Sequence, residues 1–124
     1  MSKHWNDVEP IYWQLKERTI AMILDGTLAE GDALPSVRTV ASELQLNPIT
    51  VSKSYQTLVD EGLVEKRRGL GMFVCEGAHR RLIDSERKRF LQNEWPSTLK
   101  RIEQLDLDVN DLLQAVGSGG KKKA

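Results

Sequence analysis

The sequence predicts a mainly α (α+β) protein: an N-terminal winged helix-turn-helix with a two-stranded wing, followed by a short helical appendage. Three observations support this prediction. Two short amphipathic segments, residues 35–44 and 46–62, are separated only by a tight turn. A strand–glycine–strand pattern comes directly after them in residues 63–77. Residues 78–117 then read as short helices with more apolar side chains than such helices can bury on themselves.

Length and composition fit one modest domain with an appendage. The chain has 124 residues, of which 40% are hydrophobic and 29% charged. Its longest apolar-leaning run, residues 19–24, is far shorter than the roughly 20 residues of a membrane span. The first ten residues contain no apolar signal core. Cys75 is the single cysteine, so an internal disulfide is impossible. These features predict a cytoplasmic protein that is not inserted in a membrane.

The net charge is zero but unevenly distributed. Residues 1–77 carry 8 Lys+Arg against 11 Asp+Glu, a net of −3, and residues 78–124 carry 10 against 7, a net of +3. A nucleic-acid-binding domain is usually basic. An interpretation as a DNA-binding protein therefore depends on where the few cations lie.

The first helix is expected over residues 10–26. Pro10 suits a first helical turn, and Gly26 is a typical C-terminal stop. A turn around Gly31-Asp32 comes next. The apolar face of this helix would comprise Ile11, Leu15, Met22 and Ile23.

The next two helices have recognisable N-terminal caps. Ser36 can cap residues 35–44, and Asn47 followed by Pro48 marks the start of the helix in residues 46–62. Leu46 and Val51 have the spacing of a hydrophobic staple. Gln45 occupies the turn position where glycine is common. In such a pair the second helix lies in the major groove of DNA.

Helical projection of residues 48–60 separates an apolar face from a polar one. We expect the core face to comprise Val51, Tyr55, Leu58 and Val59. We expect the opposite face to comprise Thr50, Lys53, Ser54 and Thr57, which are hydroxyls and one cation with no acid. This pattern favours contact with DNA; the alternative is an ordinary solvated face.

Residues 63–77 predict a β-hairpin whose tip is the sequence RRGLG. Arg67 and Arg68 supply positive charge, and Gly69 and Gly71 allow a close approach of the backbone to phosphate. Leu70 between the glycines is expected to be exposed. A plain polar hairpin that faces water is the alternative.

The C-terminal part is expected to be helical in residues 79–95, with two further helical pieces in 96–117. Asp108 reads as a cap, with Leu107 and Leu112 as its staple. Such an appendage has no core of its own, which predicts burial against a second copy; packing onto residues 10–25 near Trp13 is the alternative. The residues assigned to dimerisation are Leu82, Ile83, Phe90, Leu99, Ile102, Leu105, Leu112, Leu113 and Val116.

The sequences GDALP, LPSVRTVASEL and NPITVSKSYQTLVDEGLVEKRRGLGMFV resemble the DNA-binding head of the GntR family of bacterial transcription regulators. The resemblance covers roughly residues 10–75, and the short helical tail is similar to that of the YtrA-type subgroup. It implies DNA contacts by Arg38, by the wing residues Arg68 and Gly69, and by Asn47, Ile49, Thr50, Ser52 and Lys53. The chain departs from the subgroup at Ile49, where a polar residue is usual, and at Leu70, where Lys or Arg is usual.

The sequence therefore predicts a transcription regulator that binds double-stranded DNA as a homodimer on a pseudo-palindromic operator. We expect a repressor, although the sequence alone leaves repression and activation open. Residues 1–77 would form the DNA-binding domain, 78–117 the dimerisation region and 118–124 a disordered basic tail. The expected DNA-binding residues are Ser36, Arg38, Asn47, Ile49, Thr50, Ser52, Lys53, Arg67, Arg68, Gly69, Leu70 and Gly71.

Other functions are less well supported by the residues. The two histidines, His4 and His79, are expected to be surface residues, and Cys75 at the end of the wing strand is expected to be a half-buried thiol without a catalytic histidine beside it. No metal-ligand spacing or phosphate-binding loop is present. We therefore expect neither an enzyme nor a cofactor, and the sequence does not identify a small-molecule effector. A winged helix that binds another protein instead of DNA is the main alternative, which the near-neutral charge favours.

Overall fold

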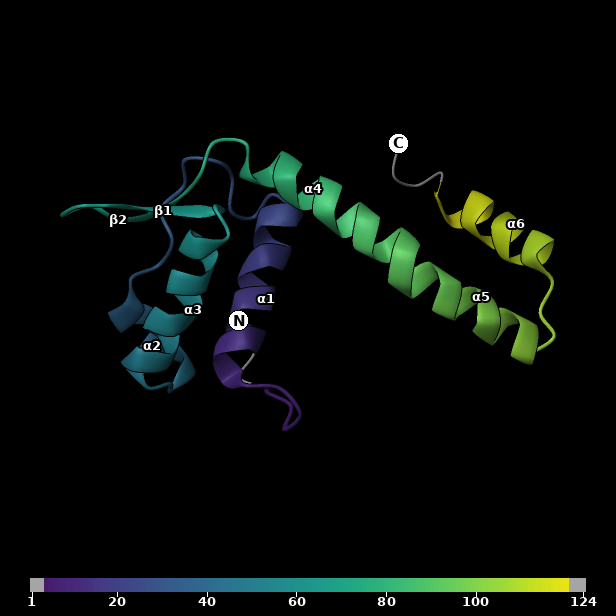
Figure 1. Ribbon diagram of the computed structural model, residues 1–124, viewed down its shortest axis with the longest axis horizontal. Coiled ribbons are helices and arrows are strands. Elements are labelled where there is room, and N and C mark those ends of the chain that lie inside the picture. The colour runs from purple at the N-terminus through teal and green to yellow at the C-terminus, as the bar shows by residue number, and fades with distance from the viewer. Residues whose placement is uncertain (1–3, 121–124) are drawn as a thin grey trace. The chain divides into compact units, whose positions relative to one another are not determined.

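The computed structural model describes residues 4–120. The chain divides between Asp84 and Ser85 into two compact units. The first contains α1 (Ile11–Leu24), α2 (Val37–Leu44), α3 (Pro48–Asp60), β1 (Val64–Arg67), β2 (Gly71–Val74) and the start of α4 (Ala78–Arg89). In it, α1 and α3 lie side by side and the hairpin projects from the helices (Figure 1). This is the predicted winged helix-turn-helix.

The caps of α2 and α3 form as the sequence predicts. Ser36 Oγ accepts a hydrogen bond from the Thr39 amide at 3.0 Å, and Asn47 Oδ1 accepts one from the Ile49 amide at 2.8 Å. Gln45 takes the left-handed conformation with φ 55°, although it is not glycine. The Leu46 amide closes the turn on the Ala41 carbonyl at 2.9 Å. Two capped helices and one strained residue thus fix the turn.

The wing is a two-stranded antiparallel sheet in which Val64 pairs with Val74 and Arg67 with Gly71. The free edge of β2 is covered by the segment that precedes α2. The Leu34 amide donates to the Met72 carbonyl at 2.8 Å, and the Gly31 amide donates to the Val74 carbonyl at 2.9 Å. This extra pairing attaches the base of the wing to the helix-turn-helix. The turn-rich character of residues 27–34 offered no sign of it.

The hydrophobic core of the first unit combines α1, α2, α3 and the wing with the first turns of α4. Ala78 and Leu82 of α4 belong to this core, and the side chain of Leu82 is only 4% exposed. Three contacts fix the same turns: the Gly77 amide to Glu30 Oε1 at 2.8 Å, His79 Nε2 with the Leu24 carbonyl at 3.0 Å, and Arg81 with the Gly62 carbonyl. The first unit therefore extends beyond residue 77.

The second unit contains the end of α4, the π-helical turn η1 (Phe90–Glu94), α5 (Trp95–Gln104) and α6 (Val109–Gly120). We expected the helix to break before Pro96, but it continues. Pro96 has no amide hydrogen and would clash with the carbonyl four residues earlier. The π-turn avoids this conflict because the Trp95 amide bonds to the Phe90 carbonyl, five residues back.

The α5–α6 connection agrees more closely with the sequence. Asp106 adopts a φ of 55°, and the Leu107 amide bonds to the Ile102 carbonyl at 3.1 Å, which ends α5. Asp108 Oδ1 then accepts from the Asn110 amide at 2.8 Å and caps α6, as predicted. Residues 118–124 were expected to be disordered, but helix α6 includes residues 118–120 and ends at Gly120. Residues 121–124 of the expected tail lie outside the described residues. No helix between residues 4 and 120 has the length and apolarity to cross a membrane.

Candidate nucleic-acid interface

The exposed face of α3 carries no acid in its first turn. Ile49 is 74% exposed, and Ser52, Lys53 and Gln56 share the exposed surface. The acid of α3, Asp60, lies at the last position of the helix and accepts a hydrogen bond from Gln56 Nε2 at 3.0 Å. The surface near the N-terminus of α3 is thus apolar, hydroxylic or cationic, which suits contact with phosphate and base edges.

Ser54 was wrongly assigned to this face. Its side chain is completely buried together with those of Val51, Tyr55 and Leu58. In the helical projection position 54 falls between 51 and 58, because residues three and four apart share a face. The Ser54 hydroxyl also forms no hydrogen bond within the described part of the chain. Ser54 is a small residue of the core.

Lys53 points toward α1. Its ammonium nitrogen lies 4.2 Å from the centroid of the Tyr12 ring. Thr50 is half-buried beside it on α3, and Asn47 is occupied in capping the helix. The residues around α3 that are predicted to contact DNA therefore form two groups. The side chains of Ile49, Ser52 and Lys53 are exposed, whereas Asn47 caps the helix and Thr50 is half-buried.

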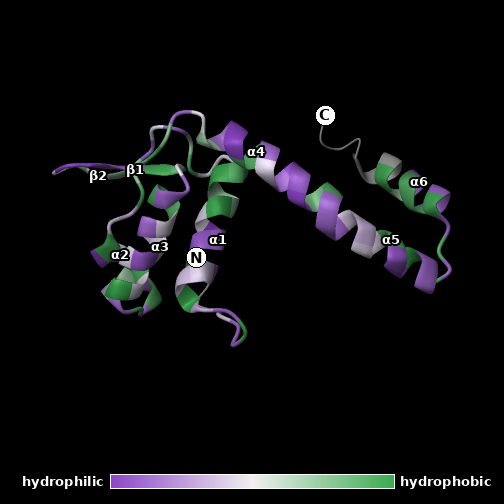
Figure 2. Cartoon of the chain, viewed as in Figure 1, coloured by the Kyte–Doolittle hydropathy of each residue, from purple (hydrophilic) through white to green (hydrophobic). Residues whose placement is uncertain are grey.

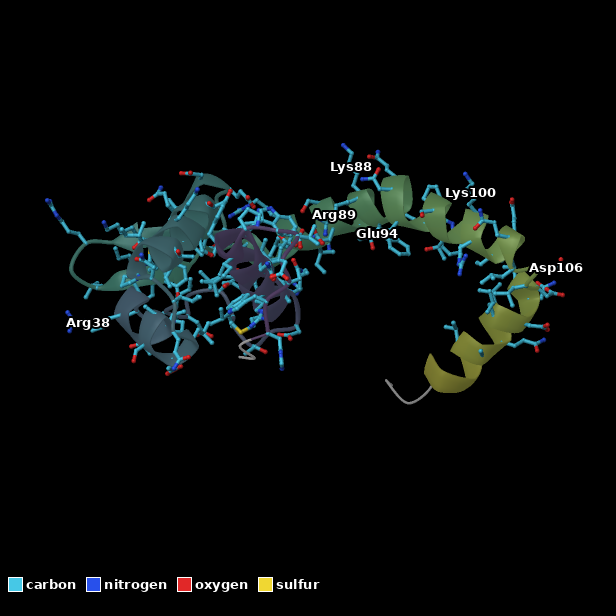
Figure 3. All side chains as sticks on the ribbon, turned by 90° about the horizontal axis from the view of Figure 1, so that it is seen from below. Arg38, Lys88, Arg89, Glu94, Lys100 and Asp106 are labelled. Atoms are coloured by element: carbon cyan, nitrogen blue, oxygen red, sulfur yellow. The ribbon has the colours of Figure 1, made fainter. Side chains whose placement is uncertain are left out.

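Helix α2 contributes Arg38. Its side chain is exposed and extends away from the helix (Figure 3). Among residues 4–120 no ion pair or hydrogen bond fixes its guanidinium. An unpaired arginine next to a helix N-terminus is available to bind an anion.

The wing tip is shaped by its glycines. Gly69 has a φ of +75° and Gly71 a φ of +115°, both in the region that L side chains rarely adopt. Between them Leu70 is 72% exposed, as predicted, and its amide donates to the Arg67 carbonyl at 2.8 Å. The tip therefore presents its backbone, the exposed side chain of Arg68 and one apolar side chain, that of Leu70.

The basic residues of the wing are not equivalent. Arg67 stacks on Phe73, with its guanidinium carbon 4.2 Å from the ring centroid, and pairs with Glu65 at 3.2 Å. Lys66 and Met72 are cross-strand partners, and successive side chains of a strand face opposite sides. Lys66 therefore lies on the side opposite to Arg67. Sequence reasoning missed Lys66; the period of two along the strand is the signal that could have identified it.

A groove of about 450 Å³ joins these parts of the first unit. One wall comes from the N-terminal end of α2, the second from α3 and the third from the wing. The predicted residues that line it are Ser36, Ser52, Arg67, Gly69, Leu70 and Gly71, together with Lys66. The fold thus places residues from three separate stretches of sequence along one cleft.

The residues assigned to dimerisation divide between the two units. Leu82 lies in the core of the first unit and is removed from that set, and Ile83 next to it is half-buried. In the second unit Ile102 is buried and Leu99 half-buried. Helix α4 is mostly hydrophilic, whereas α6 combines hydrophobic with hydrophilic and neutral residues (Figure 2). The exposed predicted residues are Phe90, Leu105, Leu112, Leu113 and Val116, and the structure adds Leu91, Trp95, Leu107 and Val109.

Cys75 and His79 have structural surroundings. Burial, with a smaller effect of the Glu65 carboxylate, raises the pKa of the Cys75 thiol, which disfavours the nucleophilic thiolate. His79 is occupied with the carbonyl at the end of α1. Neither of the two residues lines the cleft.

A helix-turn-helix with a wing, a cleft bounded by both, and a recognition helix without an acid in its first turn define a winged-helix DNA-binding transcription regulator. Residues 11–74 match the family described as "Bacterial regulatory proteins, gntR family". The chain belongs to the GntR family.

Individual relatives specify the subgroup. The chain is 40% identical to the HTH-type transcriptional repressor YtrA of Bacillus subtilis over 77 residues, which cover 62% of this chain and 59% of that protein. It is 28% identical to the uncharacterised HTH-type transcriptional regulator YhcF of the same organism, with 94% of each chain covered. The structure of YtrA from Sulfolobus acidocaldarius is 34% identical, with a TM-score of 0.57 over 73% of this chain and 95% of that chain. The chain is of the YtrA type, and its relatives are transcription regulators, not enzymes.

Proposed function

We propose that this protein is a repressor that binds a pseudo-palindromic operator as a homodimer. The single observation that carries the DNA-binding part is the cleft in which α2, α3 and the wing meet, with Lys66 along it and no acid on the first turn of α3. The repressor role is supported by the name of the YtrA relative. Membership of the family supports contact with the operator by the α3 residues, Arg38 and the wing.

The homodimer is supported by the apolar surface of the second unit. Phe90, Leu91, Leu107, Leu113 and Val116 are all exposed there. Large apolar side chains that gather on the surface of a soluble protein often mark an interface with another protein. Short helices are also marginal in water unless their apolar face packs on something. A second copy would cover this surface in both chains at once, because a two-fold interface is self-complementary.

Two recognition helices related by a two-fold axis require two inverted half-sites, about one helical turn apart or a multiple of it. The test begins with selection of bound fragments from the source genome, followed by footprinting. We expect protection of two inverted half-sites. Full affinity for a single asymmetric half-site would contradict the proposal.

The dimer itself is tested by sedimentation of Leu113→Glu. A charge placed in an apolar interface should shift the chain to monomer at concentrations where the parent is dimeric. Val8→Glu is the matched control, because Val8 is 90% exposed in the first unit and should leave the dimer intact. A dimeric Leu113→Glu variant would exclude this surface.

The alternative, a winged helix that binds only protein, makes a different prediction. DNA binding that neutralises phosphates releases counterions, so log K falls steeply with log salt. We expect that dependence here. A DNA affinity that does not change with salt would favour the protein-binding alternative.

A further inference from the structure

Tyr12 lies on α1, outside the helix-turn-helix and the wing, yet it contacts a residue of the recognition helix. The Lys53 ammonium is 4.2 Å from the centroid of the Tyr12 ring. The Tyr12 ring is half-buried and Lys53 is exposed. A cation centred over an aromatic face at this distance is attracted by the negative face of the ring.

This contact differs from an ion pair in its consequence for DNA binding. Lys16 on the same helix also lies near an aromatic ring, that of Trp13 at 5.6 Å, but its ammonium is paired with Glu61 at 2.8 Å. A carboxylate neutralises the cation, whereas an aromatic ring leaves the charge of Lys53 free to attract a phosphate. Within residues 4–120 no ion pair involves Lys53, which thus combines a restricted location with an uncompensated charge.

Lysine has a flexible four-carbon stem and loses much rotamer entropy when it is held in one place. If the Tyr12 ring already limits the position of the Lys53 ammonium in the free protein, Lys53 loses less rotamer entropy when it binds a phosphate. The ring holds the ammonium on the side of α3 that faces α1. In the proposed complex a DNA backbone passes along this side, while the exposed Ile49 and Ser52 meet the base edges.

We propose that Tyr12 is a positioning residue for operator binding, whose ring holds the Lys53 ammonium where it meets a DNA phosphate. The inference rests on the proposed function. The ring, and not the hydroxyl, is the active part, so Tyr12→Phe keeps the effect and Tyr12→Leu removes it. Since phosphates carry no base identity, the loss is the same for all DNA sequences.

The experiment measures Kd for operator and for unrelated DNA in the full chain. We expect Tyr12→Leu to weaken both about two- to fivefold, the equivalent of one exposed cation–π contact, and Tyr12→Phe to bind as the parent does. In a Lys53→Met background Tyr12→Leu should cost nothing further, because the two residues act as a pair. A Tyr12→Phe loss equal to that of Tyr12→Leu, or an undiminished Tyr12→Leu loss in Lys53→Met, would overturn the proposal.

A measurement without DNA tests the positioning role of Tyr12 separately from the proposed DNA-binding function. The ring current of Tyr12 should shift the ε-methylene proton signal of Lys53 upfield in the parent and in Tyr12→Phe, and this shift should vanish in Tyr12→Leu. Absence of the shift in the parent overturns the positioning role, whatever the DNA data. A normal shift in a parent chain that binds no DNA contradicts the proposed function instead, and the positioning role with it.

Discussion

The Tyr55 hydroxyl donates a hydrogen bond of 2.7 Å to the carbonyl of Pro35. Tyr55 lies on α3 and is 3% exposed, and Pro35 immediately precedes the capping residue of α2. The bond therefore fixes the start of α2 against the recognition helix. Both residues also line the cleft, so the bond fixes two of its walls, the start of α2 and α3, relative to each other.

The burial of the Tyr55 hydroxyl should make the stability of the fold depend on pH in the alkaline range. Burial raises the pKa of Tyr55 from 10.0 to about 12. The unfolded chain then loses this proton near pH 10 while the folded chain keeps it, so the stabilisation is complete below pH 10 and is lost as pH rises toward 12. The full effect is about 2 to 3 kcal/mol.

The measurement is urea unfolding of the parent and of Tyr55→Phe between pH 8 and 12. At the lower pH the variant should be less stable by about 1 kcal/mol, because it lacks the hydrogen bond. The gap should close and then reverse as pH rises, since phenylalanine has no proton to lose. Two stability curves that stay parallel across this range would show that the hydroxyl is not buried.

Ser54 provides a second stability prediction. Its hydroxyl is buried without a partner among the described residues, a state that costs about 1 to 3 kcal/mol. Ser54→Ala should therefore raise the free energy of unfolding, with DNA affinity unchanged. Ser52→Ala is the matched control: it brings the same gain in helix propensity at an exposed position of the same helix. If Ser54→Ala destabilises the chain, the hydroxyl has a hydrogen-bond partner in solution.

Much of the fold could be predicted from local signals. The caps at Ser36, Asn47 and Asp108 and the glycines of the wing depend on neighbouring residues only, and each of them forms. The π-turn before Pro96 could not be predicted from the sequence. A proline can either end a helix or distort it, and the neighbouring residues do not show which of the two occurs.

The residues of the candidate site that belong to a sequence motif could be predicted. The contacts that arise from packing between different helices and strands could not. Ile49, Arg38 and the wing tip are exposed, as expected. The burial of Leu82 and the contact of Lys53 with Tyr12 depend on which elements pack together, and helical projection of a single segment contains no such information. The pairing of Arg67 with Glu65 is local by contrast, because residues two apart on one strand share a side.

Arg38 should act on affinity rather than on sequence preference. It extends from α2 with no partner in the described residues, and by the resemblance it contacts DNA from the positioning helix. Arg38→Ala should weaken binding to all sequences alike and lower the slope of log K against log salt by about one. Thr50→Ala or Ile49→Ala should instead relax preference at one base position by roughly 1 to 3 kcal/mol. Binding titrations over a salt series, with operator and single-base variants, would show whether these roles are reversed.

The two faces of β1 predict different roles for adjacent cations. Lys66 lies on the opposite side of the wing from Arg67, whose charge is shared with Phe73 and Glu65. Lys66→Ala should weaken DNA binding and lower the salt slope by about one. Arg67→Ala should change DNA affinity less and cost a few tenths of a kcal/mol in stability, because an exposed pair contributes little. A larger DNA effect from Arg67→Ala would mean that it leaves Glu65 and Phe73 on binding.

The wing tip itself is tested at Gly69. An added Cβ would meet no atom within 4 Å, so space is available, but the φ of +75° strains any L residue and a β-branched one most. Gly69→Val should therefore reshape the tip and block its approach to the DNA backbone, and lower operator affinity by tenfold or more, about 1.4 kcal/mol. The core does not include the tip, so the melting temperature should move only a few degrees.

Leu70→Lys is the matched variant at the same tip. Leu70 is 72% exposed, so a lysine replaces it without loss of packing and adds a cation where phosphates would lie. We expect tighter binding, with a steeper salt dependence than in the parent. Affinity titrations at several salt concentrations, alongside thermal unfolding, measure both variants. If Gly69→Val and Leu70→Lys both bind operator DNA as the parent does, the wing does not touch DNA, and its exposed leucine and basic tip face only water.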